Sequence, residues 1–266
     1  MATILATDRL TRRFGGVVAV DALTLSVEEG EVFGLLGRNG AGKSTLIKML
    51  TTLLPPTGGK AEVAGFDIVR DAASVRATIG YVPQALSADG ELTGRENLDV
   101  FARLYDLPRG LRRSRVEESL DFMDLAEVAD KLVQTYSGGM IRRLEIAQSM
   151  LHRPRLLFLD EPTVGLDPVA REIVWKHLER LCATYGTTIV LTSHYMDEVE
   201  RLCGRMAILR RGRVVASGTR AELRAGIGEA AASLDDIFAY YTEDPTERDS
   251  GYAETATTRR AAHRLG

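Results

Sequence analysis

The sequence lacks long apolar runs, is poor in cysteine and carries little excess of either charge. No run of about 18 consecutive apolar residues, as a membrane-spanning helix needs, occurs in the 266 residues. Its two cysteines, Cys182 and Cys203, lack metal-type spacing, and we expect idle thiols in a reducing compartment. The net charge of −3 disfavours a nucleic-acid binder. The first residues also lack the basic-then-apolar layout of a signal peptide, so a cytosolic protein is expected.

The composition is that of an ordinary globular protein. Hydrophobic residues make up 45% and charged residues 27% of the chain, which excludes disorder as the dominant state. The length suffices for one large domain or two small ones.

Strand-like and helix-like segments alternate along most of the chain, which predicts an α/β sheet with parallel strands. Residues 92–151 interrupt this alternation with helical periodicity, and residues 242–266 are polar and predict a disordered tail. Strands are expected at residues 17–20, 23–27, 32–36, 61–64, 79–82, 156–159, 188–192, 206–209 and 213–217, and the other helices at 43–53, 169–184, 195–202, 219–225 and 234–241.

A glycine-rich motif lies between the apolar run 32–36 and the helix that follows. Residues 37–44, GRNGAGKS, fit the Walker A pattern G-x-x-x-x-G-K-[ST]. Its glycines let backbone N–H groups converge on a phosphate, and the helix presents its positive end to the same place. Lys43 supplies a charge for the β- and γ-phosphates, and Ser44 a hydroxyl ligand for Mg²⁺. The alternative is a glycine-rich turn without a ligand.

An acidic pair follows the apolar strand 156–159. Asp160 and Glu161 have the Walker B pattern, at the sheet edge where ligands of such folds bind. Asp160 is expected to hold Mg²⁺, and Glu161 to accept a proton from an attacking water. Taken alone, Glu161 is better explained as a solvated surface acid.

The segment Tyr136–Met140, YSGGM, opens a helix for which Ser137 is a good N-cap. A capped helix start is the simpler explanation of Ser-Gly-Gly alone. The segment lies one helix before the Walker B strand, and in that position it resembles the ATP-binding cassette signature. Residues 4–220 as a whole resemble an ABC transporter nucleotide-binding subunit. The resemblance implies a P-loop NTPase of the ABC type, with a RecA-like mixed sheet core, an antiparallel β subdomain and a helical subdomain. The cassette would span residues 1–241, with the helical subdomain at about 88–154 and C-terminal helices at about 219–241.

The resemblance assigns roles to further residues. Gln84 matches the Q-loop glutamine, a Mg²⁺ and water contact, and His194 the switch histidine at the γ-phosphate; a lone histidine is more often structural. Asp167 lies in the D-loop match, whose alternative is a proline-punctuated turn. Phe14 matches the aromatic that stacks on adenine, or is a core phenylalanine. The catalytic group would be Lys43, Gln84, Glu161 and His194, the Mg²⁺ ligands Ser44, Gln84 and Asp160, and the ATP contacts Phe14, Gly37, Asn39, Gly40, Ala41, Gly42, Lys43, Ser44, Thr45, Ser137, Gly138, Gly139 and Asp167.

Two departures from the usual signature indicate a subgroup. Met140 replaces glutamine and Tyr136 replaces leucine, as is familiar in proteins resembling the daunorubicin-resistance exporters. The segment Ser233–Phe238 also looks like the short C-terminal helix of that group. The resemblance thus favours an ABC-2 type exporter of a drug or antibiotic-like molecule.

In this family each ATP lies between the Walker A loop of one cassette and the signature of another. We therefore expect a homodimer that closes on ATP and drives a separate transmembrane permease, at the cytoplasmic face of the membrane. A non-transport assembly ATPase and an importer subunit are the alternatives. Co-purification with a soluble scaffold would indicate the assembly ATPase, and co-purification with a permease and a solute-binding protein would indicate the importer subunit.

Overall fold

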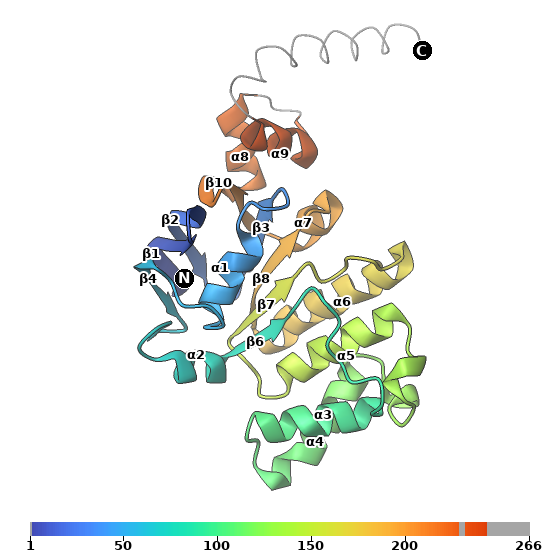
Figure 1. Ribbon diagram of the computed structural model, residues 1–266. Helices are drawn as coiled ribbons and strands as arrows, with labels where there is room; N and C mark the ends of the chain where they lie inside the picture. Colours follow the sequence, from blue (N-terminus) through green and yellow to red (C-terminus); the bar gives the residue numbers. More distant parts are fainter. Residues whose placement is uncertain (1, 229–231, 244–266) are drawn as a thin grey trace, which may run out of the picture.

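The computed structural model describes residues 2–228 and 232–243, which form two β-sheets surrounded by helices (Figure 1). One sheet is antiparallel and the other is mostly parallel. The predicted combination of a mixed sheet, an antiparallel sheet and a helical region is confirmed. No helix in the described ranges is long and apolar enough to cross a membrane.

The larger sheet has six strands in the order β10-β9-β3-β8-β7-β6. Neighbouring strands run parallel, except that β10 runs antiparallel to β9. Helices and the second sheet cover both faces of its centre, which explains the nearly continuous apolar runs of the central strands. The strands lie where the sequence predicts them: β3 (Val32–Gly37), β6 (Ile79–Val82), β7 (Leu156–Asp160), β8 (Thr188–Ser193), β9 (Arg205–Arg210) and β10 (Arg213–Thr219).

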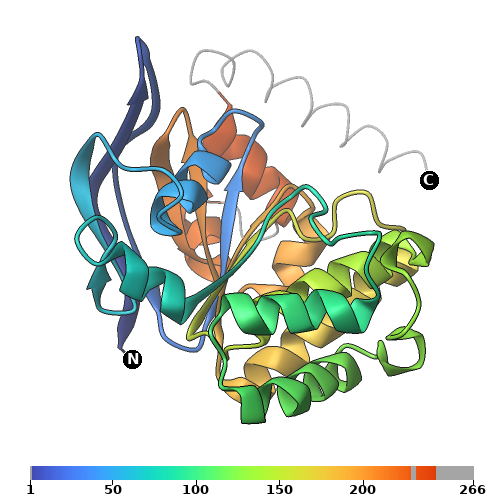
Figure 2. The ribbon, with the colours of Figure 1, turned by 60° about the horizontal axis from the view of Figure 1, so that its bottom comes forward.

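The smaller sheet has the order β2-β1-β4-β5 and lies on the other side of β3 from the helical region (Figure 2). The sequence predicted two short strands at 17–20 and 23–27, but one strand runs through both. Ala22, with φ +46°, lies at an irregularity in the pairing of that strand with β1, so the break in the apolar pattern does not end it. The strand β1 was not predicted. The four strands are β1 (Thr3–Phe14), β2 (Val17–Glu28), β4 (Gly58–Val63) and β5 (Phe66–Asp67).

The helix α1 (Lys43–Leu50) packs between the two sheets. Its buried residues Leu46, Ile47 and Leu50 share one apolar cluster with Phe158 of β7 and with the inner face of the smaller sheet. The helix is shorter than predicted, because residues 51–54 form turns before Pro55. This packing fixes the start of α1 against the carboxyl end of β3.

Four longer helices cover the opposite face of the larger sheet. Leu157 and Leu159 of β7 face this second cluster, whereas Phe158 between them faces the first, as strand geometry requires. The predicted helical subdomain contains three of the helices, at the bottom of Figure 1; its limits at about 88–154 stay a prediction. The four helices are α3 (Gly94–Leu104), α4 (Arg109–Phe122), α5 (Gly138–Met150) and α6 (Pro168–Tyr185). Two 3₁₀ turns, η1 (Ala126–Val128) and η2 (Val133–Thr135), lie between α4 and α5. A short helix that was not predicted, α2 (Ala72–Thr78), precedes β6.

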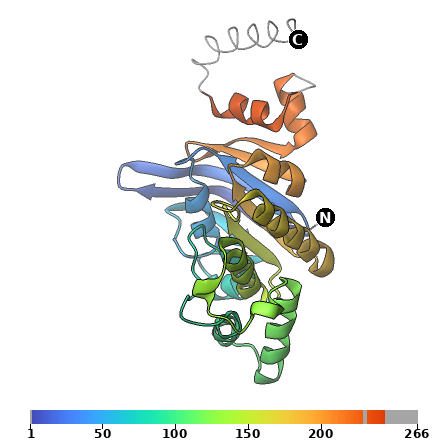
Figure 3. The ribbon, with the colours of Figure 1, turned by 90° about the vertical axis from the view of Figure 1, so that its right-hand side faces the viewer.

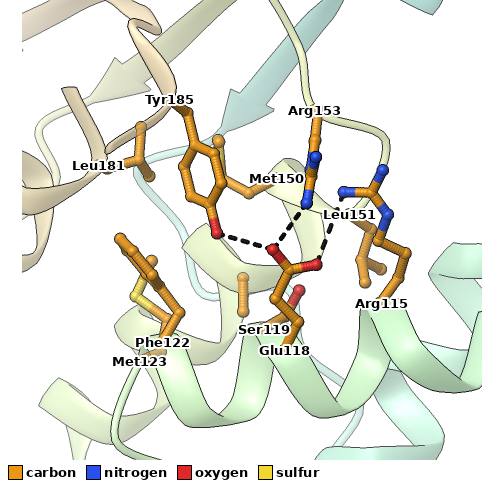
Figure 4. Close-up of a pocket in the computed structure, with 11 residues that line it drawn as sticks. Arg115, Glu118, Ser119, Phe122, Met123, Met150, Leu151, Arg153, Leu181 and Tyr185 are labelled. Atoms are coloured by element: carbon orange, nitrogen blue, oxygen red, sulfur yellow. Dashed lines mark hydrogen bonds and ion pairs between the residues drawn. The ribbon is translucent and has the colours of Figure 1, made fainter. Parts of the chain in front are cut away.

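A cluster of polar side chains around Glu118 connects α4 to the segment after α5 and to the end of α6 (Figure 4). Glu118 of α4 accepts hydrogen bonds from Arg153 Nη2 at 2.7 Å and from the Tyr185 hydroxyl, at the end of α6, at 3.0 Å. The adjoining cavity has a volume of about 20 Å³, room for about one water. We interpret this place as a structural joint.

The helices α8 (Arg220–Ile227) and α9 (Leu234–Thr242) lie at the end of the molecule opposite α3 and α4 (Figure 3). Together with α7 (Met196–Leu202), which packs beside the larger sheet, they share a third apolar cluster with β3 and β9. The tail was predicted to begin at 242, but Thr242 is buried and ends α9, where its hydroxyl donates to the Phe238 carbonyl. Residues 244–266 of the predicted tail lie outside the described residues.

Candidate nucleotide-binding site

The loop between β3 and α1 curls tightly around an open concavity. Gly40 and Gly42 have φ of +80° and +104°, in the left-handed region that favours glycine. A Cβ at Gly42 would also lie 2.4 Å from the Ala19 carbonyl oxygen, so no other residue fits there. The backbone amides that precede α1 and the positive end of that helix together form a phosphate-binding loop.

Lys43 lies within this loop with its ammonium group almost fully buried. Its Nζ donates to the Gly37 carbonyl at 2.6 Å and lies 3.9 Å from Glu161 Oε1. Burial lowers the pKa of Lys43 below its usual value, while the nearby carboxylates of Glu161 and Asp160 oppose this shift. A desolvated cation held beside open space is suited to bind an anion such as a phosphate.

Asp160, at the end of β7, is buried and firmly positioned. Its Oδ1 accepts a hydrogen bond from the Thr192 hydroxyl at 2.7 Å and from Ser44 Oγ at 3.3 Å. Mg²⁺ prefers oxygen ligands of this kind and usually keeps water and phosphate oxygens in its shell. Among the described residues, no group of three or more His, Cys, Asp or Glu side chains could hold a metal ion. Asp160 and Ser44 offer neighbouring oxygen donors, which fit a Mg²⁺ that also takes phosphate oxygens as ligands.

Glu161 has an unusual backbone conformation for a non-glycine residue. Its φ is +50°, and its N–H donates to Thr192 Oγ1 at 2.9 Å, which supports that conformation. The side chain accepts a hydrogen bond from Gln84 Nε2 at 3.0 Å, and His194 Nδ1 lies 3.5 Å from the same oxygen, Oε2. Three predicted catalytic side chains thus meet at one carboxylate oxygen.

Lys43, Glu161, Gln84 and His194 line one open cleft of about 940 Å³, whereas Asp160 is buried and is not part of its lining. Phe14, 46% exposed at the turn between β1 and β2, borders the cleft, and the Arg12 guanidinium lies 4.6 Å from its ring centre. Phe14 is therefore no core residue, and its partly exposed ring borders the cleft. The predicted residues gathered here are Phe14, Gly37, Asn39, Gly40, Ala41, Gly42, Lys43, Ser44, Thr45, Gln84, Glu161 and His194.

Four predicted ATP contacts lie elsewhere on the chain. Ser137 is the N-cap of α5 and accepts from the Met140 N–H at 3.3 Å, and Gly138 and Gly139 begin that helix. Asp167 caps α6 by accepting from the Val169 and Ala170 N–H groups. None of these four lines the cleft of the same chain. Ser137 and Asp167 are exposed, as residues that contact a second chain would be.

Sequence reasoning missed several residues of this region. Thr192 joins Asp160 and Glu161, and its polar hydroxyl in a buried strand was the available signal. Arg12 lies over Phe14, and Phe238 of α9 lines the cleft. Nothing in the sequence pattern places Phe238 near the phosphate loop, because that proximity depends on the path of the C-terminal helices.

Comparison with known proteins identifies the family. The family model described as "ABC transporter" matches residues 20–164. The daunorubicin resistance ATP-binding protein DrrA3 of Streptomyces coeruleorubidus is 46% identical over 226 residues, which is 85% of this chain and 71% of that protein. The linearmycin resistance ATP-binding protein LnrL of Bacillus subtilis is 40% identical over 225 residues, 85% of this chain and 72% of that protein.

Solved structures agree with this result. A structure titled as the ATP-binding subunit of an ABC transporter has a TM-score of 0.81 and 30% identity, covering 91% of this chain and all of the other. A dimeric cassette in a post-hydrolysis state, bound to ADP and Pi, has a TM-score of 0.71 and 25% identity, covering 81% and 98%. The chain therefore belongs to the ABC transporter family, as an ATP-binding subunit that hydrolyses ATP.

Proposed function

We propose that this subunit binds ATP with Mg²⁺ in the cleft and powers the export of a drug-like small molecule through a separate permease. The observation that carries the site assignment is the convergence of Lys43, Gln84, Glu161 and His194 beside the phosphate loop. Each side chain comes from a different segment of the chain, so only the fold brings them together.

The phosphate end of the cleft would hold the β- and γ-phosphates. The loop amides and Lys43 bind the phosphate oxygens, and Ser44, Asp160 and Gln84 supply protein oxygens for Mg²⁺. When bound, Mg²⁺ neutralises phosphate charge. Phe14 would stack on adenine, and Asn39 and Thr45 complete the loop contacts.

Hydrolysis requires a water in line with the γ-phosphate. Glu161 is placed to polarise that water, and the left-handed backbone aims its carboxylate at the cleft. Gln84 and His194, which both reach Glu161 Oε2, would orient the water and contact the γ-phosphate. Most of the rate enhancement then comes from positioning and electrostatics.

The site is completed by a second copy of the chain. Ser137, Gly138, Gly139 and Asp167 do not line the cleft of their own chain and would close on the cleft of another subunit. The dimeric cassette with ADP and Pi, to which this fold is similar, supports that arrangement. ATP binding would close the homodimer, and hydrolysis would open it.

The names of the relatives support export. Two of them are resistance proteins for daunorubicin and linearmycin, and another, from Ralstonia nicotianae, is a Nod factor export ATP-binding protein. We propose that residues 1–241 form the cassette and act at the cytoplasmic face of the membrane, peripherally, through the permease. The permease would determine which molecule is carried.

Co-expression with the membrane protein encoded beside it tests this proposal. We expect the two proteins to purify as a complex whose ATPase rate rises when a transported drug-like compound is added. Everted vesicles containing the complex should accumulate that compound only with ATP. Co-purification with a soluble scaffold or a solute-binding protein instead would contradict export.

Replacing Phe14 with alanine should weaken ATP binding about 5- to 150-fold, because base–aromatic stacking contributes about 1–3 kcal/mol. Isothermal titration with ATP measures the loss. Phe14→Tyr retains the ring and should bind nearly as well as the wild type. Equal ATP affinity in Phe14→Ala would show that the ring does not contact the nucleotide.

A further inference from the structure

A buried ion pair within α5 has no part in the site as described so far. Arg142 and Glu145 lie on adjacent turns of the helix, and each side chain is only 2% exposed. Arg142 Nη1 lies 3.0 Å from Glu145 Oε2. Burial lowers the pKa of Arg142 and raises that of Glu145, so water provides neither charge with much stabilisation.

Both charged groups reach across to the segment that follows β6. Arg142 donates from Nη1 to the Pro83 carbonyl at 2.7 Å and from Nη2 to the Gln84 carbonyl at 2.8 Å. Glu145 Oε1 accepts hydrogen bonds from the Ser87 hydroxyl at 3.1 Å and from the Ser87 N–H. The ion pair therefore holds the segment 83–87 by hydrogen bonds at its first two residues and at its last residue.

That segment has no regular secondary structure to hold it. Strand β6 ends at Val82, and the side chains of residues 84–87 are exposed. Yet Gln84 within it must keep its Nε2 at 3.0 Å from Glu161. A planar guanidinium that donates to two successive carbonyls fixes the backbone on which this side chain depends.

We propose that Arg142 and Glu145 are positioning residues for hydrolysis, which hold Gln84 against Glu161 and join it to the signature helix. The inference rests on the proposed roles of Gln84 and of Ser137. Ser137 is the N-cap of α5, and Arg142 lies little more than one turn further along the helix. The helix that would touch ATP in the partner subunit thus sets the position of Gln84 in its own cleft.

The decisive variant removes both charges together, Arg142→Met with Glu145→Leu. Replacing both members of a buried pair with apolar side chains of similar size often leaves stability unchanged. Removing only one member leaves the other charge buried and unpaired, which is strongly destabilising. We expect kcat to fall about 10- to 100-fold, because small misplacements of catalytic groups carry such costs. The Kd for ATP and the urea midpoint of unfolding should stay close to those of the wild type.

A double-mutant cycle separates positioning from general structural damage. In a Gln84→Ala background, the paired substitution Arg142→Met/Glu145→Leu should cause no further loss of kcat, since no Gln84 side chain remains to be positioned. The milder variant Glu145→Gln should show a smaller loss with the same dependence on Gln84. Arg143→Met is the matched control: Arg143 is on the same helix but donates to the Met123 carbonyl, so kcat should be unchanged.

The outcomes distinguish this inference from the proposal beneath it. Wild-type kcat in the folded Arg142→Met/Glu145→Leu variant, or an equal fold loss with and without Gln84, would overturn the positioning role alone. Wild-type kcat in Gln84→Ala itself would overturn the proposed role of Gln84 and this inference with it.

Discussion

Replacing Glu161 with glutamine should leave ATP binding intact and lower kcat by about 10²- to 10⁴-fold, the usual contribution of a general base. Glutamine keeps the shape of the side chain and can still meet Gln84 and His194, but it cannot accept a proton from water. Its neutral amide also removes a negative charge near the γ-phosphate, so the affinity for ATP should be equal or higher. Single-turnover ATP hydrolysis and equilibrium titration measure the two effects separately.

The control for this variant is Glu62→Gln, an exposed acid on β4 outside the cleft. It should hydrolyse ATP at the wild-type rate. A Glu161→Gln protein that retains full turnover would show that another group, or none, acts as the base.

Replacing Lys43 with alanine should raise the Kd for ATP about 10- to 150-fold, because a charged hydrogen bond contributes about 1.5–3 kcal/mol. The substitution also leaves the carboxylates of Asp160 and Glu161 without their neighbouring cation, so their repulsion of the phosphates increases. Fluorescence titration with a labelled ATP analogue measures the affinity.

Lys48→Ala is the matched control, since Lys48 lies on the same helix with its side chain exposed to solvent. It should bind ATP as the wild type does. Unchanged affinity in Lys43→Ala would contradict the assignment of residues 37–44 as a phosphate-binding loop.

The sequence predicted the central sheet well because burial on both faces leaves a simple signal. Strand β7 is apolar from Leu156 to Leu159 and ends at Asp160, and β3 contains only apolar residues and glycine and ends at Gly37. Strand β1 lacks that signal: it pairs with β2 through several register shifts, so Leu10 is buried while polar residues surround it. Helix α2 is short and buries only Val75, too little for a visible apolar period.

The site was predictable where chemistry demands a local motif. Walker A and Walker B each lie within a few successive residues, so Lys43, Asp160 and Glu161 could be named from the sequence. Thr192 and Arg142 act through hydrogen bonds to segments far away in the chain, at sequence separations of 31 and 58 for Glu161 and Gln84. Contacts of that kind depend on the assembled sheet and helices, and no local pattern reveals them.

In the proposed dimer, two chains close jointly on ATP, and Ser137 of each acts at the cleft of the other. The most direct test measures the molecular mass of the Glu161→Gln protein in solution. The mass should be that of a dimer with ATP and that of a monomer with ADP. Adding Ser137→Asp keeps a good helix cap but repels the phosphates, whereas Ser137→Asn keeps the cap without charge. We expect Ser137→Asp to block ATP-induced dimers and Ser137→Asn to permit them. Equal dimerisation of both variants, or no dimer with ATP in Glu161→Gln itself, would contradict the joint closure of two chains.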